Sequence, residues 1–151
     1  MIPKKITILS EDFPPYAGGI AQWAHGVATS LHDLGHTVNV VTRYRSQYVP
    51  FQYPFPLTFM NGSYWKQLRT YYCYRSIKQL YRDGIVPDAI IATTWNCARG
   101  IVALAHRYQS RVVTVAHGLE MTRTMSFLKR RWLTRTLRDC DRVIEIGRAH
   151  V

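Results

Sequence analysis

The chain has 151 residues and is 47% hydrophobic, a length and composition that suit one domain burying roughly 70% of its unfolded surface. Its 20 lysines and arginines exceed its 9 acidic residues, and the net charge of +11 favours a polyanionic partner: nucleic acid, anionic lipid or a phosphorylated substrate. The sequence has no apolar run of about 18 residues and no signal-peptide pattern, so we expect neither a membrane-spanning helix nor secretion.

The first 60 residues predict strands on both sides of a helix. Residues 5–10 form an apolar run of strand length, residues 20–34 have helical periodicity, and residues 37–42 (TVNVVT) follow a Gly-His turn as a second strand. Residues 44–59 are rich in proline and aromatic side chains, which is typical of an irregular crossing with one short edge strand near residues 57–59.

The remainder of the chain continues this alternation. We expect three further helices and three further strands, in the order helix 65–82, strand 89–92, helix 99–108, strand 111–116, helix 126–137 and strand 142–146. Strands that alternate with helices form a mostly parallel sheet. The predicted fold class is therefore α/β, a Rossmann-like doubly wound sheet with helices on both faces.

The helix after the first strand begins without an ordinary capping residue. In FPPYAGGIAQWAH, residues 13–25, Gly18 and Gly19 stand where Ser, Thr, Asp or Asn usually caps a helix. Glycine leaves the first backbone N–H groups without a side-chain partner and lets a ligand approach closely, which is typical of an anion site. A plain turn is the alternative interpretation, and the dinucleotide-binding pattern G-x-G-x-x-G is absent.

Right-handed crossovers would bring three loops to one edge of the sheet, residues 12–19, 93–96 and 117–120. Candidate acceptor-binding or cleft residues in these loops are Asp12, Thr94, Trp95, Asn96 and Glu120. His117 directly follows a buried strand and precedes a glycine, so its imidazole can project into a crevice. A hydrogen-bonded structural histidine is the alternative interpretation.

Cysteine and histidine usage argues against disulfides and metal sites. The three cysteines, Cys73, Cys97 and Cys140, are odd in number and far apart, which favours reduced, buried thiols in a cytoplasmic protein. The six histidines match no zinc-binding spacing, so we expect no metal and no other cofactor.

Four segments of the chain resemble one family of enzymes. FPPYAGGI, GHTVNVVT, HGLE and DCDRVIEI, in this order and spacing, look like the N-terminal domain of glycosyltransferase family 4, the retaining enzymes of the GT-B fold. The resemblance covers residues 5–145. We therefore expect residues 1–145 to form this acceptor-side domain, the N-terminal half of a GT-B fold.

The resemblance implies roles for three residues. In this family two Rossmann-like domains face each other, and the diglycine loop, here Gly18 and Gly19, lies against the diphosphate of the sugar donor. The histidine of the HGLE segment, here His117, becomes the catalytic candidate near the transferred sugar. The nucleotide-sugar is a substrate, and most of its contacts belong to a C-terminal domain that we expect to be missing, so this chain alone should be inactive.

Two basic, aromatic-rich helices support a further hypothesis. Residues 65–82 and 123–138 combine lysines and arginines with aromatic side chains, as interfacial helices on anionic lipid do. The alternatives are a core-facing apolar stripe with a solvated basic back, and a binding site for a nucleic-acid backbone. The candidate membrane-surface residues are Trp65, Lys66, Arg69, Arg130, Arg131 and Trp132.

The predicted function is that of the acceptor side of a truncated retaining hexosyltransferase. It would move a sugar from a nucleotide-sugar to a lipid or polysaccharide acceptor at the cytoplasmic face of a membrane, as a peripheral protein. The alternative is a basic α/β module that binds nucleic acid. We interpret residues 146–151 (IGRAHV) as a tail foreign to the natural protein, because one reading frame of a common sequencing-library adapter encodes it; a natural end is the alternative.

Overall fold

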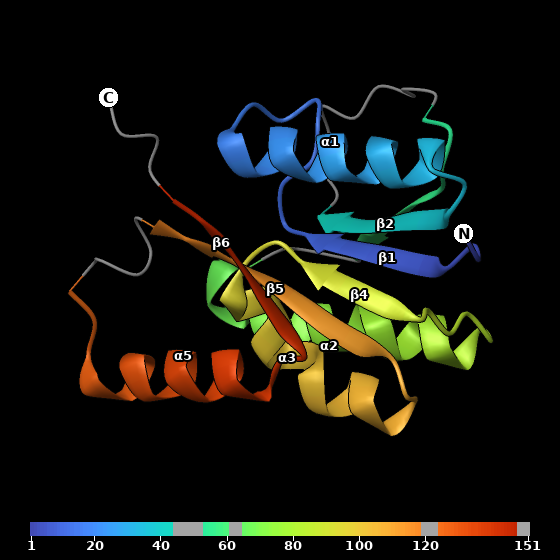
Figure 1. Cartoon of the computed structure of the whole chain (residues 1–151). Coiled ribbons are helices and arrows are strands. Elements are labelled where there is room, and N and C mark those ends of the chain that lie inside the picture. The colour runs from blue at the N-terminus through green and yellow to red at the C-terminus, as the bar shows by residue number, and fades with distance from the viewer. Residues whose placement is uncertain (44–52, 61–64, 119–123, 148–151) are drawn as a thin grey trace.

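The computed structural model describes residues 1–43, 53–60, 65–118 and 124–147, which form one six-stranded sheet (Figure 1). Neighbouring strands are parallel throughout, in the order β3-β2-β1-β4-β5-β6. The strands are β1 (Lys5–Ser10), β2 (Thr37–Arg43), β3 (Leu57–Met60), β4 (Ala89–Ala92), β5 (Arg111–His117) and β6 (Arg142–Ile146). The strand order reverses between β1 and β4, which is where ligands collect in doubly wound sheets.

Helices cover both faces of this sheet. α1 (Gly19–Asp33) packs on β1 and β2 from one side, and three helices lie on the opposite side (Figure 1). These are α2 (Arg69–Arg82), which a short 3-10 helix η1 (Lys66–Leu68) precedes, α3 (Trp95–Arg107) and α5 (Phe127–Asp139). The predicted α/β, Rossmann-like class, with its parallel sheet between helices, is confirmed.

The pleat of the strands directs alternate side chains into two hydrophobic layers. Ile8 and Val40 pack with Phe13 under α1, whereas Leu9 and Val41 pack against α2 and α3. All five side chains are fully buried. Because both faces bury apolar groups, each central strand is a nearly continuous hydrophobic run, and such runs are visible in the sequence.

α3 begins four residues earlier than the sequence predicts. The Thr94 hydroxyl accepts a hydrogen bond from the Cys97 N–H at 3.4 Å and so caps the helix directly after β4. Trp95 and Asn96, which we expected in a loop, therefore lie in the first helical turn. Their positions are set by the helix rather than by a flexible connection.

The contact between α2 and α3 depends on a glycine. A Cβ on Gly100 would overlap the backbone carbonyl oxygen of Thr70 in α2. The two helices therefore approach each other more closely here than a larger residue would allow. This contact sets the spacing between the first turn of α2 and the middle of α3.

All three cysteines are free thiols, as expected. Cys73 and Cys97 are buried, and the pKa of Cys73 is raised well above its ordinary value by its hydrogen bond with Cys97 and by burial. Cys140 is half-buried rather than buried, and desolvation raises its pKa to about 11. Cys73 and Cys140 therefore stay protonated at neutral pH, which disfavours thiolate chemistry at both.

The last strand reaches into the segment that we interpret as a foreign tail. Ile146, the first residue of that segment, ends β6 and pairs with His117 of β5. Residues 148–151 lie outside the described residues. The origin of the tail, and the domain boundary at residue 145, stay predictions.

Candidate functional site

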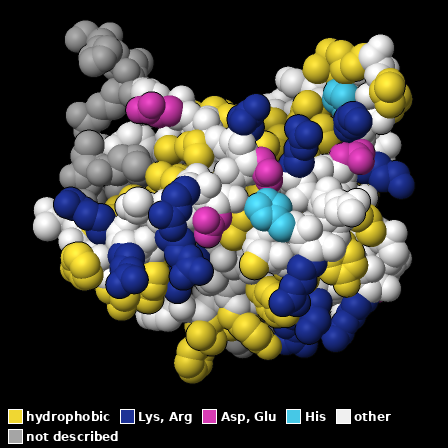
Figure 2. Space-filling model, turned by 60° about the horizontal axis from the view of Figure 1, so that its bottom comes forward, with side chains coloured by type: hydrophobic (Ala, Val, Ile, Leu, Met, Phe, Trp, Pro, Cys, Tyr) yellow, Lys and Arg dark blue, Asp and Glu magenta, His cyan; other side chains and the backbone are white. Residues whose placement is uncertain are grey.

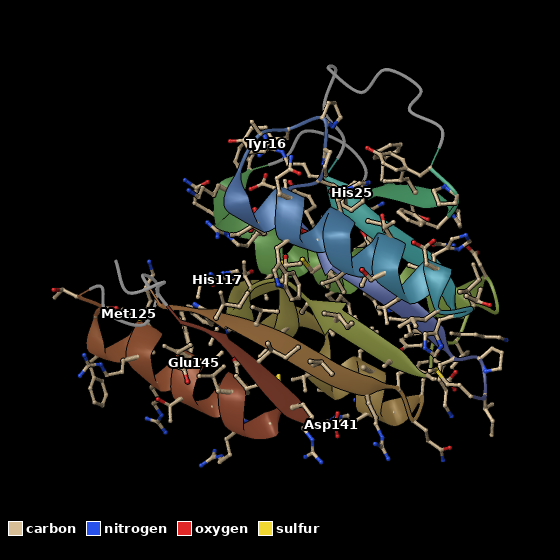
Figure 3. The ribbon with its side chains drawn as sticks, turned by 45° about the horizontal axis from the view of Figure 1, so that its top comes forward. Tyr16, His25, His117, Met125, Asp141 and Glu145 are labelled. Atoms are coloured by element: carbon tan, nitrogen blue, oxygen red, sulfur yellow. The ribbon has the colours of Figure 1, made fainter. Side chains whose placement is uncertain are left out.

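The loops that follow β1, β4 and β5 meet at the carboxyl edge of the sheet, as predicted. Figure 3 shows Tyr16, His117 and Met125 at this edge, and Asp141 at the opposite, amino edge. Thr93 connects the loops: its N–H donates to the Leu9 carbonyl at 3.0 Å, and its hydroxyl donates to Ser10 Oγ at 2.9 Å. The parallel sheet thus gathers residues that are far apart in the sequence.

The start of α1 is open to a ligand. Gly18 occupies the N-cap position, no side chain caps the helix, and its first turn contains no acidic residue. A Cβ on Gly18 would lie 3.9 Å from the Tyr16 ring, and one on Gly19 would meet nothing within 4 Å. Packing among the described residues therefore does not require glycine at either position, and the space before the helix remains accessible.

Packing of a buried ring and two hydrogen bonds hold the turn between β1 and α1 in place. Phe13 is fully buried, with its ring 5.4 Å from that of Tyr53, and the Tyr53 hydroxyl donates to the Pro14 carbonyl at 2.9 Å. Asp12 lies half-buried in this turn, where its carbonyl accepts from Ser10 Oγ at 2.6 Å. The anchoring positions the two glycines relative to the sheet.

A hydrogen bond to a described residue orients the His117 ring. Its Nε2 lies 2.7 Å from the Thr93 carbonyl oxygen, which can only accept, so Nε2 carries the proton. The ring is half-buried at the carboxyl end of β5, and Gly118 follows it. This bond fits the structural interpretation of His117, and it also fixes the orientation that a catalytic role would need.

The other predicted cleft residues have different positions. Thr94 is buried, and its hydroxyl caps α3 and donates to Cys97 Sγ at 3.3 Å. Trp95 is only 5% exposed, and Asn96 is half-buried beside it. Glu120 lies outside the described residues. Of the predicted set, Trp95 and Asn96 line a common hollow.

That hollow lies where the three α-helices α2, α3 and α5 begin, beside the short η1 that precedes α2, and we call it the three-helix groove. It consists of two adjoining hollows of about 400 and 520 Å³ that share Lys66, Arg69, Trp95, Asn96 and Lys129 as lining residues. Arg99 and Trp132 complete the wall on the α3 and α5 side. Figure 2, which looks onto the face of α2, α3 and α5, shows lysines and arginines outnumbering carboxylates there.

Two guanidinium groups in the three-helix groove are fixed by contacts. Arg69 Nη1 lies 3.3 Å from Glu11 Oε1, and Arg69 Nε donates to the Lys66 carbonyl at 3.1 Å. The Arg99 guanidinium stacks over the Trp132 ring, 3.8 Å from its centroid. Such contacts hold the charges in place before any ligand arrives.

The predicted membrane-surface residues do not share one face. Lys66, Arg69 and Trp132 line the three-helix groove, whereas Arg130 and Arg131 line the outer side of α5. Trp65, just before η1, is 65% exposed. The structure therefore divides the set into a groove and a helix surface.

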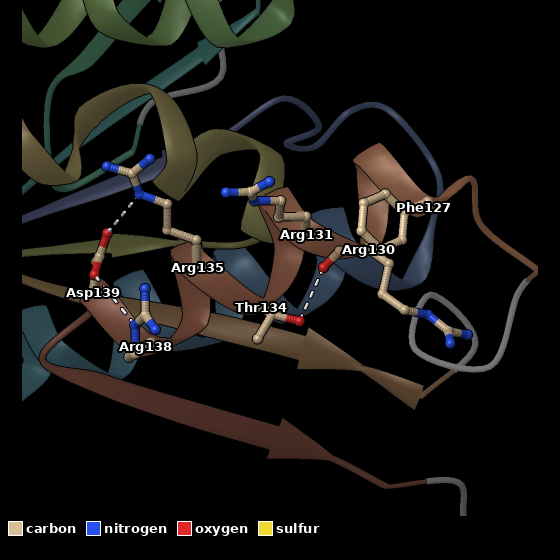
Figure 4. A pocket seen from close by; sticks show the side chains of 7 residues that line it. All are labelled: Phe127, Arg130, Arg131, Thr134, Arg135, Arg138 and Asp139. Carbon is tan, nitrogen blue, oxygen red and sulfur yellow. Dashed lines mark hydrogen bonds and ion pairs between the residues drawn. The ribbon is translucent and has the colours of Figure 1, made fainter.

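The outer side of α5 is a shallow basic hollow of about 610 Å³ (Figure 4). Phe127 at its end is 82% exposed, and Leu128 beside it is also exposed. The lining residues after Phe127 are Arg130, Arg131, Thr134, Arg135, Arg138 and Asp139. Asp139 contacts two of these arginines, Arg135 at 3.7 Å and Arg138 at 4.0 Å.

The apolar stripe of α2 is part of the core. Its buried residues are Cys73, Ile77, Leu80 and Tyr81. For this helix the core-facing interpretation is confirmed. Helix α5 buries less, with Leu133 and Thr136 as its buried residues.

The described parts of the chain contain neither a membrane-spanning helix nor a candidate metal site. None of the described helices is long and apolar enough to cross a membrane. Within the described ranges, His, Cys, Asp and Glu side chains form no group of three or more that could hold a metal ion. The carboxyl edge instead presents imidazole, amide and cationic groups, which suit sugar hydroxyls and phosphates.

The fold and this edge define a class of protein: a Rossmann-like domain with an open, uncapped helix start at the switch point of its sheet. The family model of Glycosyltransferase Family 4 matches residues 17–149, and the chain belongs to this family. No curated protein sequence matches it significantly.

Solved structures share the fold at low sequence identity. The chain is similar to sucrose-phosphate synthase from Thermosynechococcus elongatus, with a TM-score of 0.71, 16% identity and coverage of 93% of this chain and 41% of that one. The catalytic domain of starch synthase IV from Arabidopsis thaliana, bound to ADP and acarbose, is similar with a TM-score of 0.62 and 15% identity. The match covers 79% of this chain and 35% of that one. Acinetobacter baumannii MurG is similar with a TM-score of 0.55 and 16% identity, and the match covers 99% of this chain and 43% of that one.

All three neighbours are GT-B glycosyltransferases, and the chain spans less than half of the length of each. The shared fold, together with family membership, identifies the chain with the Rossmann-like domains of such enzymes. These comparisons do not favour the nucleic-acid-binding module that the net charge left open.

Sequence reasoning missed the three-helix groove as a unit. Gln67, Thr70, Arg99 and Lys129 belong to it but come from η1, α2, α3 and α5 respectively. One sequence signal was present: the first turns of η1, α2, α3 and α5 contain no acidic residue, although helices usually favour aspartate or glutamate there. Positive charge therefore accumulates at this edge.

Proposed function

We propose that this chain is the acceptor-side domain of a retaining hexosyltransferase that moves a sugar from a nucleotide-sugar to a lipid or polysaccharide acceptor. The open start of α1 carries the proposal. Gly18 and Gly19 leave the first N–H groups of the helix facing the carboxyl edge, and the helix dipole adds roughly half a positive charge there. A diphosphate is the ligand that such a helix start binds well.

His117 is the catalytic candidate in this proposal. Its Nε2 is engaged with the Thr93 carbonyl, so the ring is oriented by the sheet and keeps Nδ1 for another partner. In the proposed complex the imidazole faces the transferred sugar, near the reacting carbon. Most of the donor contacts are supplied by a second Rossmann-like domain, and the reaction uses no metal or other cofactor.

The proposed reaction balances without a further reactant. The bond between the anomeric carbon and the diphosphate oxygen breaks, and the electron pair leaves with the nucleoside diphosphate. An acceptor hydroxyl oxygen bonds to the same face of that carbon, and its proton passes to the departing phosphate. The N–H groups at Gly18 and Gly19 stabilise the charge that develops on the leaving group.

The test is made on the protein encoded by the complete source locus. Sequencing is expected to show a frame that continues into a second Rossmann-like domain, and a stop codon directly after Val151 would contradict this. The complete protein, incubated with UDP- and GDP-sugars and a lipid extract, should form a glycosylated product. Nuclear magnetic resonance should show that the anomeric configuration is retained.

We also propose that the outer side of α5 contacts the cytoplasmic face of an anionic membrane. Exposed Phe127 and Leu128 offer apolar side chains beside four arginines, a combination that suits the interface of anionic lipid. Arg130 and Arg131 form no ion pair with the described residues, whereas Arg135 and Arg138 contact Asp139. The unpaired arginines should contribute most to binding.

Charge reversal tests the membrane contact. Replacing Arg130 and Arg131 by Glu should weaken binding to phosphatidylserine vesicles by about 1 kcal/mol for each lost cation, measured by co-sedimentation. The control is the double change Arg82→Glu and Arg107→Glu, which alters net charge equally at two exposed helix C-termini. Equal losses in both variants would mean that total charge, and not α5, governs the binding.

A further inference from the structure

The three-helix groove contains more cations than the described carboxylates neutralise. Lys66, Arg69, Arg99 and Lys129 line it, and Glu11 is the one carboxylate that forms an ion pair with any of them among the described residues. Like charges placed this close repel one another, and helix N-termini at the same place add to the positive potential. Such an arrangement costs stability unless an anion occupies it.

The groove also contains groups that recognise the shape of an anion. The Arg69 and Arg99 guanidinium groups are fixed by Glu11 and Trp132, so their N–H donors are oriented in advance. The Asn96 side chain has no hydrogen-bond partner in the described part of the chain and lines both adjoining hollows. Oriented guanidinium groups beside lysine ammonium groups are a suitable set of donors for a phosphate group.

The groove adjoins the proposed reaction centre. Trp95 and Asn96 begin α3 two and three residues after Thr93, whose carbonyl accepts the hydrogen bond from His117. An acceptor anchored in the groove would therefore extend along the start of α3 toward His117. A donor diphosphate, in contrast, is proposed at α1, on the opposite face of the sheet.

We infer that the three-helix groove binds a phosphate or diphosphate ester carried by the acceptor. This inference rests on the proposed function only in naming the ligand an acceptor, because phosphate binding by the groove does not depend on sugar transfer. The phosphate belongs either to a soluble sugar phosphate or to a lipid-linked diphosphate, and both present the same chemistry to the groove. A second anion site on this edge means that the enzyme recognises both of its substrates through phosphate.

The test uses the 151-residue chain with inorganic pyrophosphate, measured by isothermal titration calorimetry. The double change Lys66→Ala and Lys129→Ala should weaken binding at least about tenfold, because each removes a charged hydrogen-bond donor. The matched control, Arg82→Ala with Arg107→Ala, removes the same charge from the exposed C-terminal ends of α2 and α3 and should leave binding within about twofold of the original. Circular dichroism melting checks that the variants fold.

Two further arms identify the site and the ligand. Gly19→Val should preserve groove binding; if it abolishes pyrophosphate binding while the lysine variant retains it, the site is at α1 and the inference is wrong. Arg99→Lys keeps the charge but loses the planar fork, so a partial loss of affinity is expected. Equal binding in every variant, or none in the unaltered chain, also overturns the inference.

Probe ligands separate the sources of the phosphate. Glucose 6-phosphate represents a soluble acceptor, geranyl diphosphate a lipid-linked one, and glucuronate tests whether a carboxylate serves as well. Glucuronate binding as tight as that of both phosphates would overturn the phosphate assignment. If the groove binds phosphate but the complete protein transfers no sugar, the proposed function is contradicted and this inference stands. If the complete protein transfers sugar but binding does not depend on the groove, this inference is contradicted and the proposed function stands.

Discussion

The two sides of the carboxyl edge offer an anion different chemistry. On the α1 side, residues 12–25 contain no lysine or arginine, and the donors are backbone N–H groups at Gly18 and Gly19. On the other side, the three-helix groove presents four cationic side chains. Backbone donors act only at contact and in one orientation, whereas charged side chains also attract an anion over a distance and are screened by salt.

The difference suits two separate tasks. A leaving group must be held in one geometry while its charge changes, and rigid N–H groups do this without reorganising. An acceptor must be captured and then released, and side-chain cations provide attraction over a longer range. The following variants test whether the two sides act independently.

The largest effect is expected for His117→Ala, which removes the side chain that Thr93 orients. Turnover of the complete enzyme should fall roughly 100-fold to 1000-fold, as when one preorganised polar group is removed from an active site. Steady-state kinetics with a nucleotide-sugar donor measures this. The control is His106→Ala at the amino edge, where turnover should be unchanged. Unaltered turnover in the His117 variant would leave this residue with a structural role.

Gly19→Val should lower turnover by about 100-fold, since displacing a bound group by about 1 Å has such an effect. The added side chain fills the space in front of α1 without meeting any described atom within 4 Å, so the melting temperature should change little. Gly26 lies in the same helix and is equally unobstructed, which makes Gly26→Val the matched control. Equal turnover in the two variants would show that the diphosphate does not bind at the start of α1.

Gly100→Ala should disturb the groove side alone. The new Cβ overlaps a backbone atom of Thr70, so α2 and α3 must separate, and the unfolding free energy should fall by about 1 to 2 kcal/mol despite the better helix propensity of alanine. Urea unfolding of the chain measures this. Gly26→Ala, which meets nothing, should instead stabilise by up to about 1 kcal/mol. A higher unfolding free energy in both variants would show that α2 and α3 can separate without a loss of stability.

The smallest effect is expected at the amino edge, away from both sites. Burial alone would raise the pKa of Asp141, but hydrogen bonds from the Val112 N–H and His106, at 2.7 and 2.9 Å, outweigh it and lower the pKa below its ordinary 3.8. Its contribution is therefore present above the ordinary pKa and is lost as pH falls through the lowered one. For this largely exposed group we expect about 0.5 kcal/mol.

Comparison with Asp141→Asn isolates this contribution. Between pH 5 and about pH 3, the unfolding free energy of the original chain should fall more steeply than that of the variant. Pyrophosphate binding should be the same in both proteins at neutral pH. Parallel stability curves would show that Asp141 titrates as it does in the unfolded chain, and altered binding would show that the two edges are coupled.

Much of the fold was predictable because the central strands are buried on both faces. The runs ending at Ser10, Ala92 and Ala116 are apolar and flanked by turn residues, and each was located within one residue. The start of α3 was misplaced because the cap at Thr94 precedes any helical periodicity. The glycine pair and His117 were predicted as candidates since glycine and histidine are informative in a single sequence, and their roles stay predictions.

Local order along the chain is therefore enough to predict the strand sequence, the parallel sheet and the loops that share one edge. The three-helix groove required the tertiary structure, because Lys66, Arg99 and Lys129 become neighbours only when three helices pack on the same face. The close approach of α2 and α3 depends on Gly100, whose contact with Thr70 joins residues 30 positions apart. Periodicity and capping act within a few residues, whereas the charge density of the groove arises from packing between distant segments, which no local pattern encodes.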